Sequence, residues 1–346
     1  MAKDRIITRD SHPLDTPVEA ESAGVLRPKT LDEYVGQPQL RERLNVALNA
    51  AKQRTDPMEH TLLHGPPGLG KTTLAHIIAH EMGTRAYVTS GPALTKGGDL
   101  VGTLTRMQPG DILFIDEIHR LPAAVEEYVY PAMEDFKIDF TLDSGIHAKV
   151  ITYHLKPFTL IGATTRAGLL TGALRSRFGI SHRLDYYEQD ELFEILIRAM
   201  SRLGIDKVPK DAVHEIAKRS RGTPRIGLRL MRRVRDFAQV RRDGCLDSSV
   251  VAEALELEGV DDAGLDNLDR LYLTTLVTVY EGGPAGLEAI AATMGEDPGT
   301  LEDVVEPYLL QIGFLARTRQ GRQITPAGRE WLGASEAGGS GLFVNK

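Results

Sequence analysis

The sequence predicts an α/β domain with a mainly parallel sheet, followed by a small all-α unit and a third unit of three helices and a β-hairpin. Short apolar runs alternate with helical stretches over residues 25–187, which is the pattern of a parallel sheet covered by helices. From Gln189 to about Leu257 the apolar residues recur only at helical spacing. Beyond Asp261 the helical runs lead into two short β-like runs around Gly321.

Composition bounds the class of protein. The chain has 346 residues, of which 42% are apolar, enough for the cores of two or three domains. It contains no apolar stretch of about eighteen residues and begins with polar and charged residues, so we expect a cytoplasmic protein without a membrane span or secretory signal. Its single cysteine, Cys245, excludes an internal disulfide and a cysteine metal cluster. The net charge of −7 argues against a protein whose whole surface is basic and binds nucleic acid, but it allows a local basic surface.

The first motif is a phosphate-binding loop. Residues 65–72 read GPPGLGKT, which fits G-x-x-x-x-G-K-[ST], and they lie between the apolar run Thr61–Leu63 and a helical stretch. The glycines let successive backbone N–H groups turn toward a nucleotide's phosphates, while Lys71 supplies a mobile positive charge and Thr72 a hydroxyl for Mg²⁺. The alternative is a Gly-Pro turn that caps an ordinary helix.

The second motif is an acidic pair at the end of a buried strand. The apolar run Ile112–Ile115 is too short for a helix and ends in Asp116 and Glu117, so it is predicted to be a strand buried on both faces. Open α/β sheets bind their ligands at the carboxyl ends of such strands. We expect Asp116 to hold Mg²⁺ and Glu117 to polarise the attacking water. The alternative is a solvated acidic pair.

The remaining elements of the first unit are assigned by periodicity. A hairpin is predicted within residues 137–155, where runs at 138–142 and 150–153 flank a Gly-containing turn. Ile146 lies near its tip and is either a stray apolar residue or a docking point for a partner. Residues 1–24 lack apolar periodicity and residues 334–346 are rich in Gly and Ser, so both ends are predicted to be disordered. The other predicted helices are 40–52, 72–82 and 123–133, and the other strands are 86–89 and 159–163.

The segment Lys218–Arg242 is strongly basic, with Asp236 as its only acidic residue. Its charges either pair with carboxylates of the same domain or a neighbouring subunit, or they meet an anionic ligand. Arg225 is a special case because Pro224 suits the first turn of a helix, so the Arg225 side chain is expected at a helix start, where phosphates commonly bind.

These motifs occur in the order of an AAA+ ATPase. Within that superfamily the chain resembles the RuvB family of Holliday-junction branch-migration motors over nearly its whole length, from Leu26 to the C-terminal unit, which resembles a winged helix. The resemblance implies a large ATPase domain (25–187), a small helical lid domain (188–259) and a winged-helix DNA-binding domain (260–333). Segments that are typical of the RuvB family and absent in this form from clamp loaders are Leu31–Gln37, Met133–Phe136 and the inserted hairpin. The other shared motifs are Gly162–Arg166, Leu174–Gly179 and Arg221–Arg225.

The resemblance also implies roles in binding ATP and Mg²⁺. Thr165, with Thr164 beside it, would sense the γ-phosphate, and Arg177 would be the arginine finger that acts on the neighbouring subunit's nucleotide. Arg175 is the rival for that role. Leu26 and Arg27 would line the adenine pocket, and Tyr187 and Arg225 would close over the nucleotide. The phosphates would be bound by Gly68, Leu69, Gly70, Lys71, Thr72 and Thr73, and the subunit interface would contain Glu134, Asp135 and Phe136.

For DNA, the resemblance points to the C-terminal hairpin. Arg317 and Arg322 match family positions that contact DNA, and a third contact is an arginine where this chain has Pro298. Arg319 is a possible substitute. The alternative is that these arginines belong to a solvated hairpin.

The resulting hypothesis is a homohexameric ATPase that translocates duplex DNA at four-way junctions in recombination and repair, with a RuvA-like junction-recognition protein and a RuvC-like resolvase as partners. A clamp loader and a nucleotide-gated scaffold without motor activity are the alternatives. The presence of Glu117 and Arg177 argues against the scaffold. The winged helix and the lack of cysteine zinc ligands argue against the commonest clamp-loader subunits.

Overall fold

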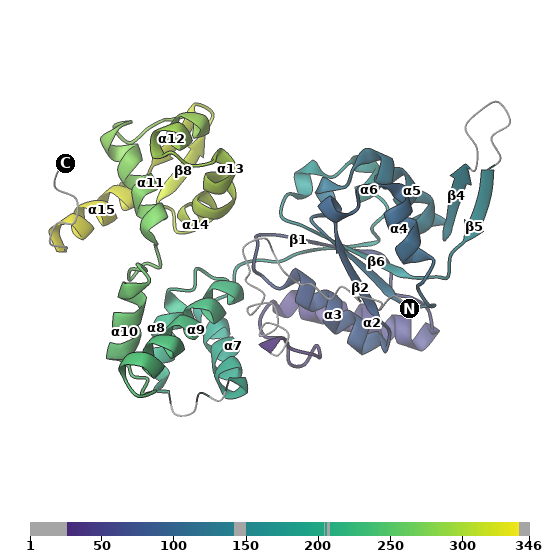
Figure 1. Cartoon of the computed structure of the whole chain (residues 1–346), viewed down its shortest axis with the longest axis horizontal. Helices are drawn as coiled ribbons and strands as arrows, with labels where there is room; N and C mark the ends of the chain where they lie inside the picture. The colour runs from purple at the N-terminus through teal and green to yellow at the C-terminus, as the bar shows by residue number, and fades with distance from the viewer. Residues whose placement is uncertain (1–25, 142–149, 204, 206–207, 339–346) are drawn as a thin grey trace, which may run out of the picture. The chain divides into compact units, whose positions relative to one another are not determined.

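A computed structural model describes residues 26–141, 150–203, 205 and 208–338 (Figure 1). Ile146, predicted at the tip of the inserted hairpin, lies outside the described residues. The chain divides into two compact units, residues 1–205 with 223–225 and residues 206–222 with 226–346.

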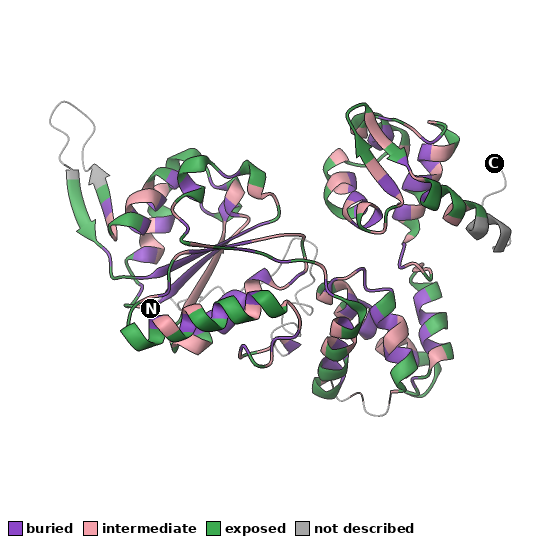
Figure 2. Ribbon diagram, turned by 180° about the vertical axis from the view of Figure 1, so that it is seen from behind, coloured by how far each residue is buried: buried purple, intermediate pink, exposed green. Residues whose placement is uncertain are grey.

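The first unit is built on a five-stranded sheet in the order β2-β3-β6-β1-β7. All its strand pairs are parallel. Every residue of β6 is buried, as are the four apolar residues of β3, and Figure 2 shows the centre of the sheet as buried. Because β6 lies between β1 and β3, the strands that carry the phosphate loop and the acidic pair are not neighbours. The strands are β1 (Thr61–His64), β2 (Ala86–Ser90), β3 (Ile112–Asp116), β6 (Thr159–Thr164) and β7 (Ile180–Arg183).

Helices cover both faces of this sheet, with α2 and α3 on one side and α4, α5 and α6 on the other (Figure 1). The predicted hairpin is present as an antiparallel pair, β4 (Lys137–Thr141) and β5 (Val150–His154), that projects from the unit. The helices are α2 (Pro38–Arg54), α3 (Lys71–Met82), α4 (Gly97–Leu104), α5 (Ala123–Glu134), α6 (Gly172–Arg175) and α7 (Gln189–Arg202).

Helix α4 and strand β7 are among the elements of the first unit that the sequence pattern does not predict. Helix α4 begins with Gly97 and Gly98, which are unfavourable in helices, and its start is stabilised by Asp99, which accepts a hydrogen bond from the backbone of Lys96 at 3.0 Å. Strand β7 lies at the sheet edge and has one fully buried residue, His182, so its sequence lacks the apolar run that marks the other strands.

The second unit contains lid helices followed by a winged helix, and the three-part architecture confirms the predicted fold class. The basic segment forms much of α9, which buries Leu230, Met231 and Val234 on its other face. Several of the segment's arginines pair with carboxylates of this unit, at Arg219–Asp262, Arg221–Asp266, Arg235–Asp236 and Arg242–Glu253. The lid helices of this unit are α8 (Lys210–Lys218), α9 (Pro224–Arg241, grouped with this unit from residue 226) and α10 (Ser248–Leu257).

The winged helix has its own core around Tyr272, Leu276 and Leu309. The helix predicted over residues 301–312 is divided into a π turn (Leu301–Val305) and α14, because Pro307 has no N–H for the i→i−4 bond. The other elements are α11 (Asn267–Thr278), α12 (Leu287–Met294), α13 (Pro298–Thr300), α14 (Glu306–Gln311), β8 (Leu315–Thr318), β9 (Gly321–Ile324) and α15 (Pro326–Gly338).

The end of α15 corrects the start of the disordered tail predicted over residues 334–346. The helix continues to Gly338, which is four residues beyond the start of the flexible tail predicted at residue 334. Alanine and glutamate are favourable in helices, and residues 334–337 include three of them, which outweigh the serine among them.

Candidate nucleotide site

The phosphate loop joins β1 to α3, and two of its glycines are required by their geometry. Gly65 has φ 141°, and a Cβ atom there would lie 2.3 Å from the carbonyl oxygen of Leu184. Gly70 caps the start of α3 with φ 94°. The loop therefore delivers the chain directly into a helix N-terminus, where unpaired backbone N–H groups favour anions.

Lys71 lies in the first turn of α3 and reaches back into the loop. Its Nζ donates hydrogen bonds to the carbonyl oxygens of Gly65 at 2.9 Å and Pro66 at 2.7 Å. Burial lowers the pKa of Lys71 to about 8, and the charge of Asp116 opposes part of this shift. The ammonium is thus held by neutral carbonyls that the phosphates of a nucleotide can replace.

This pKa predicts a pH dependence of nucleotide binding. Phosphates favour the charged lysine, so affinity is highest below pH 8 and falls as the pH rises through the pKa of the free protein. Between pH 8 and pH 9.5 the affinity for ADP is expected to fall by up to about fifteenfold. Titration calorimetry across this range tests the effect. Lys71→Ala should bind more weakly at pH 7 and show a flat profile, and an equally steep profile in that variant would contradict the assignment.

The acidic pair occupies the end of β3. Glu117 has a left-handed backbone, φ 46°, and its N–H donates to Oδ1 of Asp116 at 2.9 Å. Arg120 donates to Oε2 of Glu117 at 2.9 Å, a half-exposed pair that contributes little to stability. The charge of Asp116 acts on Lys71, so the acidic pair lies near the phosphate loop.

Two threonines, Thr164 at the end of β6 and Thr165 after it, belong to the strand that lies between β1 and β3. Thr164 is fully buried, and its Oγ1 lies 2.9 Å from Nδ1 of His119 and accepts a hydrogen bond from the N–H of Arg166. Thr165 follows it and is exposed. The sequence does not predict the contact between His119 and Thr164, since no local pattern indicates a partner forty-five residues away.

A buried tyrosine pair packs against the phosphate loop. The hydroxyl of Tyr187 donates to the hydroxyl of Tyr34 at 2.7 Å and lies 3.3 Å from the carbonyl oxygen of Leu69. Burial raises the pKa of Tyr34 to about 12 and that of Tyr187 well above its usual value, so both stay neutral. Tyr187 is among the predicted site residues and Tyr34 is not. The available signal for Tyr34 is an aromatic ring within the family-typical residues 31–37.

The segment predicted to line the adenine pocket is attached to α7. Arg202 donates from Nη1 to the carbonyl oxygens of Leu26 at 3.1 Å and Arg27 at 3.0 Å, and its Nη2 pairs with Glu33 at 3.0 Å. The Leu26 side chain is buried. Arg202 is not among the predicted residues, because one more arginine in an amphipathic helix carries no distinguishing signal.

Arg225 lies beside the phosphate loop. A Cβ atom on Gly68 would approach Cβ of Arg225 to 3.2 Å. After burial, the charge of Arg225 also lowers the pKa of Lys71, whereas the charge of Asp116 raises it. Pro224 begins α9, as predicted. Arg225 is exposed and can therefore meet a nucleotide held by the loop.

Arg177 contacts residues of α5 and α6. Its Nη2 pairs with Glu134 at 3.0 Å, its Nη1 donates to the carbonyl oxygen of Ala173 at 2.6 Å, and its guanidinium lies 4.3 Å from the ring centroid of Tyr130. The rival Arg175 donates to the carbonyl oxygen of Ala167.

Asp135 and Phe136, the other residues predicted at a subunit interface, differ in their surroundings. Asp135 pairs with Lys137 at 2.7 Å and is exposed. The Phe136 ring packs edge-on against Phe158, with ring centroids 5.8 Å apart, and so contributes to the core of its own chain.

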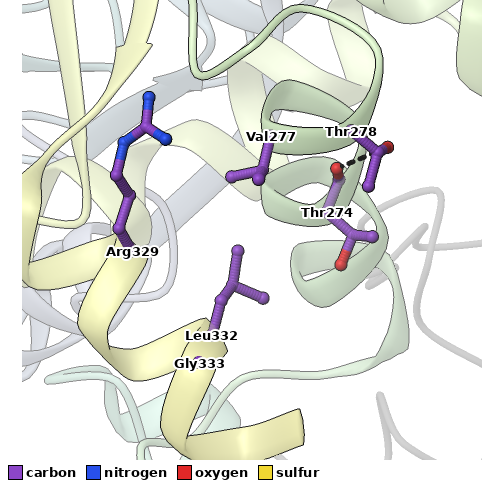
Figure 3. A pocket seen from close by; sticks show the side chains of 6 residues that line it. All are labelled: Thr274, Val277, Thr278, Arg329, Leu332 and Gly333. Atoms are coloured by element: carbon purple, nitrogen blue, oxygen red, sulfur yellow. Dashed lines mark hydrogen bonds between the residues drawn. The ribbon is translucent and has the colours of Figure 1, made fainter.

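The winged helix presents the two predicted DNA-contacting arginines on its hairpin. Arg317 of β8 stands opposite Arg322 of β9. A pocket on the same domain lies between α11 and α15 (Figure 3). Its one charged group, Arg329, donates to the carbonyl oxygen of Glu281 at 2.8 Å, so the pocket offers no set of catalytic groups. It is lined by Thr274, Val277, Thr278, Arg329, Leu332 and Gly333.

Within the part of the chain that the structure describes, no helix is long and apolar enough to cross a membrane. The strand order, the phosphate loop after β1, the acidic pair at the end of β3, the threonines at the end of β6 and the arginine beside the loop together define an ATPase of the AAA+ class.

Comparison with known proteins specifies the family. Family models match residues 26–184 (Holliday junction DNA helicase RuvB P-loop domain), 187–261 (RuvB AAA lid domain) and 262–333 (RuvB C-terminal winged helix domain). The chain belongs to the RuvB family.

Relatives agree over nearly the whole length. The RuvB subunit of the Holliday junction branch migration complex from Desulfosudis oleivorans is 53% identical over 97% of this chain and 100% of its own. That from Limosilactobacillus reuteri is 52% identical over 91% and 93%. Among solved structures, Thermotoga maritima RuvB, described as a Holliday junction branch migration motor, matches with a TM-score of 0.81 at 50% identity, over 89% of this chain and 98% of that one.

Proposed function

We infer that this chain is the ATP-driven subunit of a branch-migration complex that moves duplex DNA through four-way junctions. The observation that carries the proposal is the coexistence, in one chain, of a complete nucleotide site with a winged helix whose hairpin presents two facing arginines. The site supplies hydrolysis, and the winged helix supplies contact with DNA backbone, which any sequence offers.

In this proposal the nucleotide is ATP with Mg²⁺. Thr72 and Asp116 hold the metal, and Glu117 polarises the attacking water. Thr165 senses the γ-phosphate, Arg225 and Tyr187 close over the nucleotide, and Leu26 and Arg27 contact the adenine. The phosphates are bound along residues 68–73.

We further propose that Arg177 serves the nucleotide of an adjacent subunit in a homohexamer. Its guanidinium is bound by Glu134 and Tyr130 rather than by its own phosphate loop, which supports a role at a subunit boundary. Glu134 and the residue after it, Asp135, are both exposed and belong to that boundary in the proposal.

The DNA-binding part is tested by removing the two arginines. Because Arg317 and Arg322 both pair with the buried Glu306, the test variant combines Arg317→Ala, Arg322→Ala and Glu306→Gln, so that no buried carboxylate is left without its partners. We expect weaker binding of all duplex sequences and a slope of log affinity against log salt that is shallower by about two. Fluorescence anisotropy over a salt series measures both. ATP binding should be unchanged, and an unaltered slope would show that the arginines belong to a solvated hairpin.

A RuvA-like junction-recognition protein and a RuvC-like resolvase are the proposed partners, acting with the chain on DNA in the cytoplasm. The inserted hairpin is the proposed docking surface for the first of these. Ile146 is the contact predicted from the sequence, and on β5 the side chains of Ile151 and Tyr153 are 41% and 44% exposed. Exposed apolar residues on a projecting hairpin favour a protein partner.

Charge on this hairpin is therefore expected to break docking. Ile146→Asp and, independently, Ile151→Asp should leave basal ATPase activity intact and eliminate its stimulation by the junction-recognition protein. Val240, an 84% exposed apolar residue of α9, offers the control Val240→Asp, which should keep the stimulation. Stimulation that survives both hairpin substitutions would rule out this surface.

A further inference from the structure

The hairpin of the winged helix places two like charges directly opposite each other. Arg317 and Arg322 are register partners in the β8–β9 ladder. Like charges at such positions repel and destabilise the pairing of strands. Something must therefore compensate the pair.

The compensating group is a carboxylate buried beneath the hairpin. Glu306, the first residue of α14, has an exposed fraction of 0%. Its Oε2 accepts from Nε of Arg317 at 2.7 Å and its Oε1 accepts from Nε of Arg322 at 2.9 Å. The hydroxyl of Tyr272 donates to Oε1 at 2.8 Å. Although burial alone would lower it, the hydrogen bond and charge of Glu306 raise the pKa of Arg322.

A second carboxylate, Glu302, lies within 4.0 Å of the same two guanidinium groups. Oε1 of Glu302 is 3.8 Å from Nη1 of Arg317 and 3.9 Å from Nη2 of Arg322. These distances exceed a hydrogen bond, and the Glu302 side chain is 34% exposed. Glu302 belongs to the π turn, a local deviation that is frequent at functional sites.

The two glutamates therefore differ in kind. Glu306 is enclosed and bonded to both arginines, whereas Glu302 is part-exposed and places one negatively charged oxygen near both guanidinium groups. A phosphate oxygen has the same charge, and arginine pairs bind phosphate with the same donors.

We propose that Glu306 positions Arg317 and Arg322 as a single phosphate clamp, and that Glu302 occupies the phosphate position until DNA displaces it. This inference rests on the proposed function, in which these arginines contact DNA. Two further residues then take part in DNA binding. Glu306 is a positioning residue. Glu302 competes with phosphate, which lowers the affinity of the clamp for DNA and so allows it to release each phosphate.

The decisive variant is Glu302→Gln, because its part-exposed side chain can change without emptying the core. Removal of the competing charge is expected to tighten binding of a fluorescently labelled duplex of arbitrary sequence by about two- to fivefold at low salt. Glu288→Gln, which removes the same charge from an exposed position on α12, is the matched control and should change affinity little. Equal gains from both variants would show that only net charge matters and would overturn the role of Glu302.

Glu306→Gln tests the positioning role. The amide keeps the shape but leaves two facing arginines without a counter-charge, so we expect binding to weaken by about tenfold and the salt slope to become shallower. The same substitution added to Arg317→Ala with Arg322→Ala should instead raise the melting temperature, since it removes an unpaired buried charge, and should not weaken DNA binding further. A folded Glu306→Gln variant with wild-type affinity and salt slope would overturn this role.

One triple variant distinguishes a failure of the phosphate clamp from a failure of the proposed DNA contact. In the triple variant Arg317→Ala, Arg322→Ala, Glu306→Gln, adding Glu302→Gln should give no gain in affinity, because the clamp is absent. If the triple variant binds DNA like the wild type, the proposed DNA contact is wrong and the clamp with it. If the triple variant binds weakly but Glu302→Gln still tightens it by the full factor, the contact stands and the clamp is wrong. If Glu306→Gln fails to fold, the Glu302 variants alone decide.

Discussion

Glu117→Gln is expected to bind ATP and Mg²⁺ normally and to hydrolyse ATP at least about 10²-fold more slowly. The amide has the shape of the carboxylate and can adopt the same left-handed backbone, so the end of β3 should be preserved. It cannot polarise water as an anion does. The substitution also breaks the ion pair between Glu117 and Arg120, but both side chains are half-exposed, so this pair contributes little to stability.

Binding and hydrolysis must be measured separately for this prediction. Equilibrium binding of a fluorescent ATP analogue should match the wild type, while phosphate release should nearly vanish. Lys71→Ala is the contrasting variant, because it removes the charge inside the phosphate loop and should weaken binding itself. Hydrolysis by Glu117→Gln within a few-fold of the wild type would remove Glu117 from its proposed role.

Arg177→Ala is expected to lower ATP turnover by about 10³- to 10⁵-fold while nucleotide binding by the chain is retained. Its partner Glu134 is 53% exposed, so breaking the pair should not unfold the domain. Arg175→Ala is the matched control two residues away. Because Arg175 donates to a backbone carbonyl of its own chain, that variant should keep most activity.

If Arg177 serves the nucleotide of an adjacent subunit, assemblies that mix two inactive variants should regain activity. An Arg177→Ala chain keeps Glu117, and a Glu117→Gln chain keeps Arg177, so a neighbouring pair can form one intact site. Mixing the two inactive chains should restore part of the ATPase activity in proportion to the chance of such pairs. Normal hydrolysis by Arg177→Ala as an isolated monomer would refute the assignment, and an inactive Arg175→Ala beside an active Arg177→Ala would transfer the role to Arg175.

The elements that could be predicted share a local cause. The phosphate loop is recognisable because one short segment must combine left-handed glycines, a helix start and a lysine. Strand β3 is recognisable because a strand buried on both faces must be apolar throughout and then stop at its charged end. Strand β7 has no such constraint: it lies at the sheet edge and buries one histidine. Its existence depends on β1 being present to pair with it.

The parts of the nucleotide site that could not be predicted from the sequence are contacts between distant segments. Three hydrogen-bonded contacts join residues from separate elements: Tyr34 with Tyr187, Thr164 with His119, and Arg202 with the carbonyl oxygen of Leu26. Side chains such as these have no periodic signature, because the partner is defined by the packing of the sheet and its helices rather than by spacing along the chain.

By itself the sequence determined the class of chemistry and the order of the domains, since short motifs carry the first and the periodicity of apolar residues along the chain carries the second. It also placed two arginines on the C-terminal hairpin. Only the tertiary structure decided how those arginines are held. Pro307 interrupts the helix, the π turn precedes it, and Glu306 thereby lies under Arg317 and Arg322 while Glu302 lies near both guanidinium groups. The physical reason is that a carboxylate's effect on a cation depends on burial and distance, and both are properties of the folded domain.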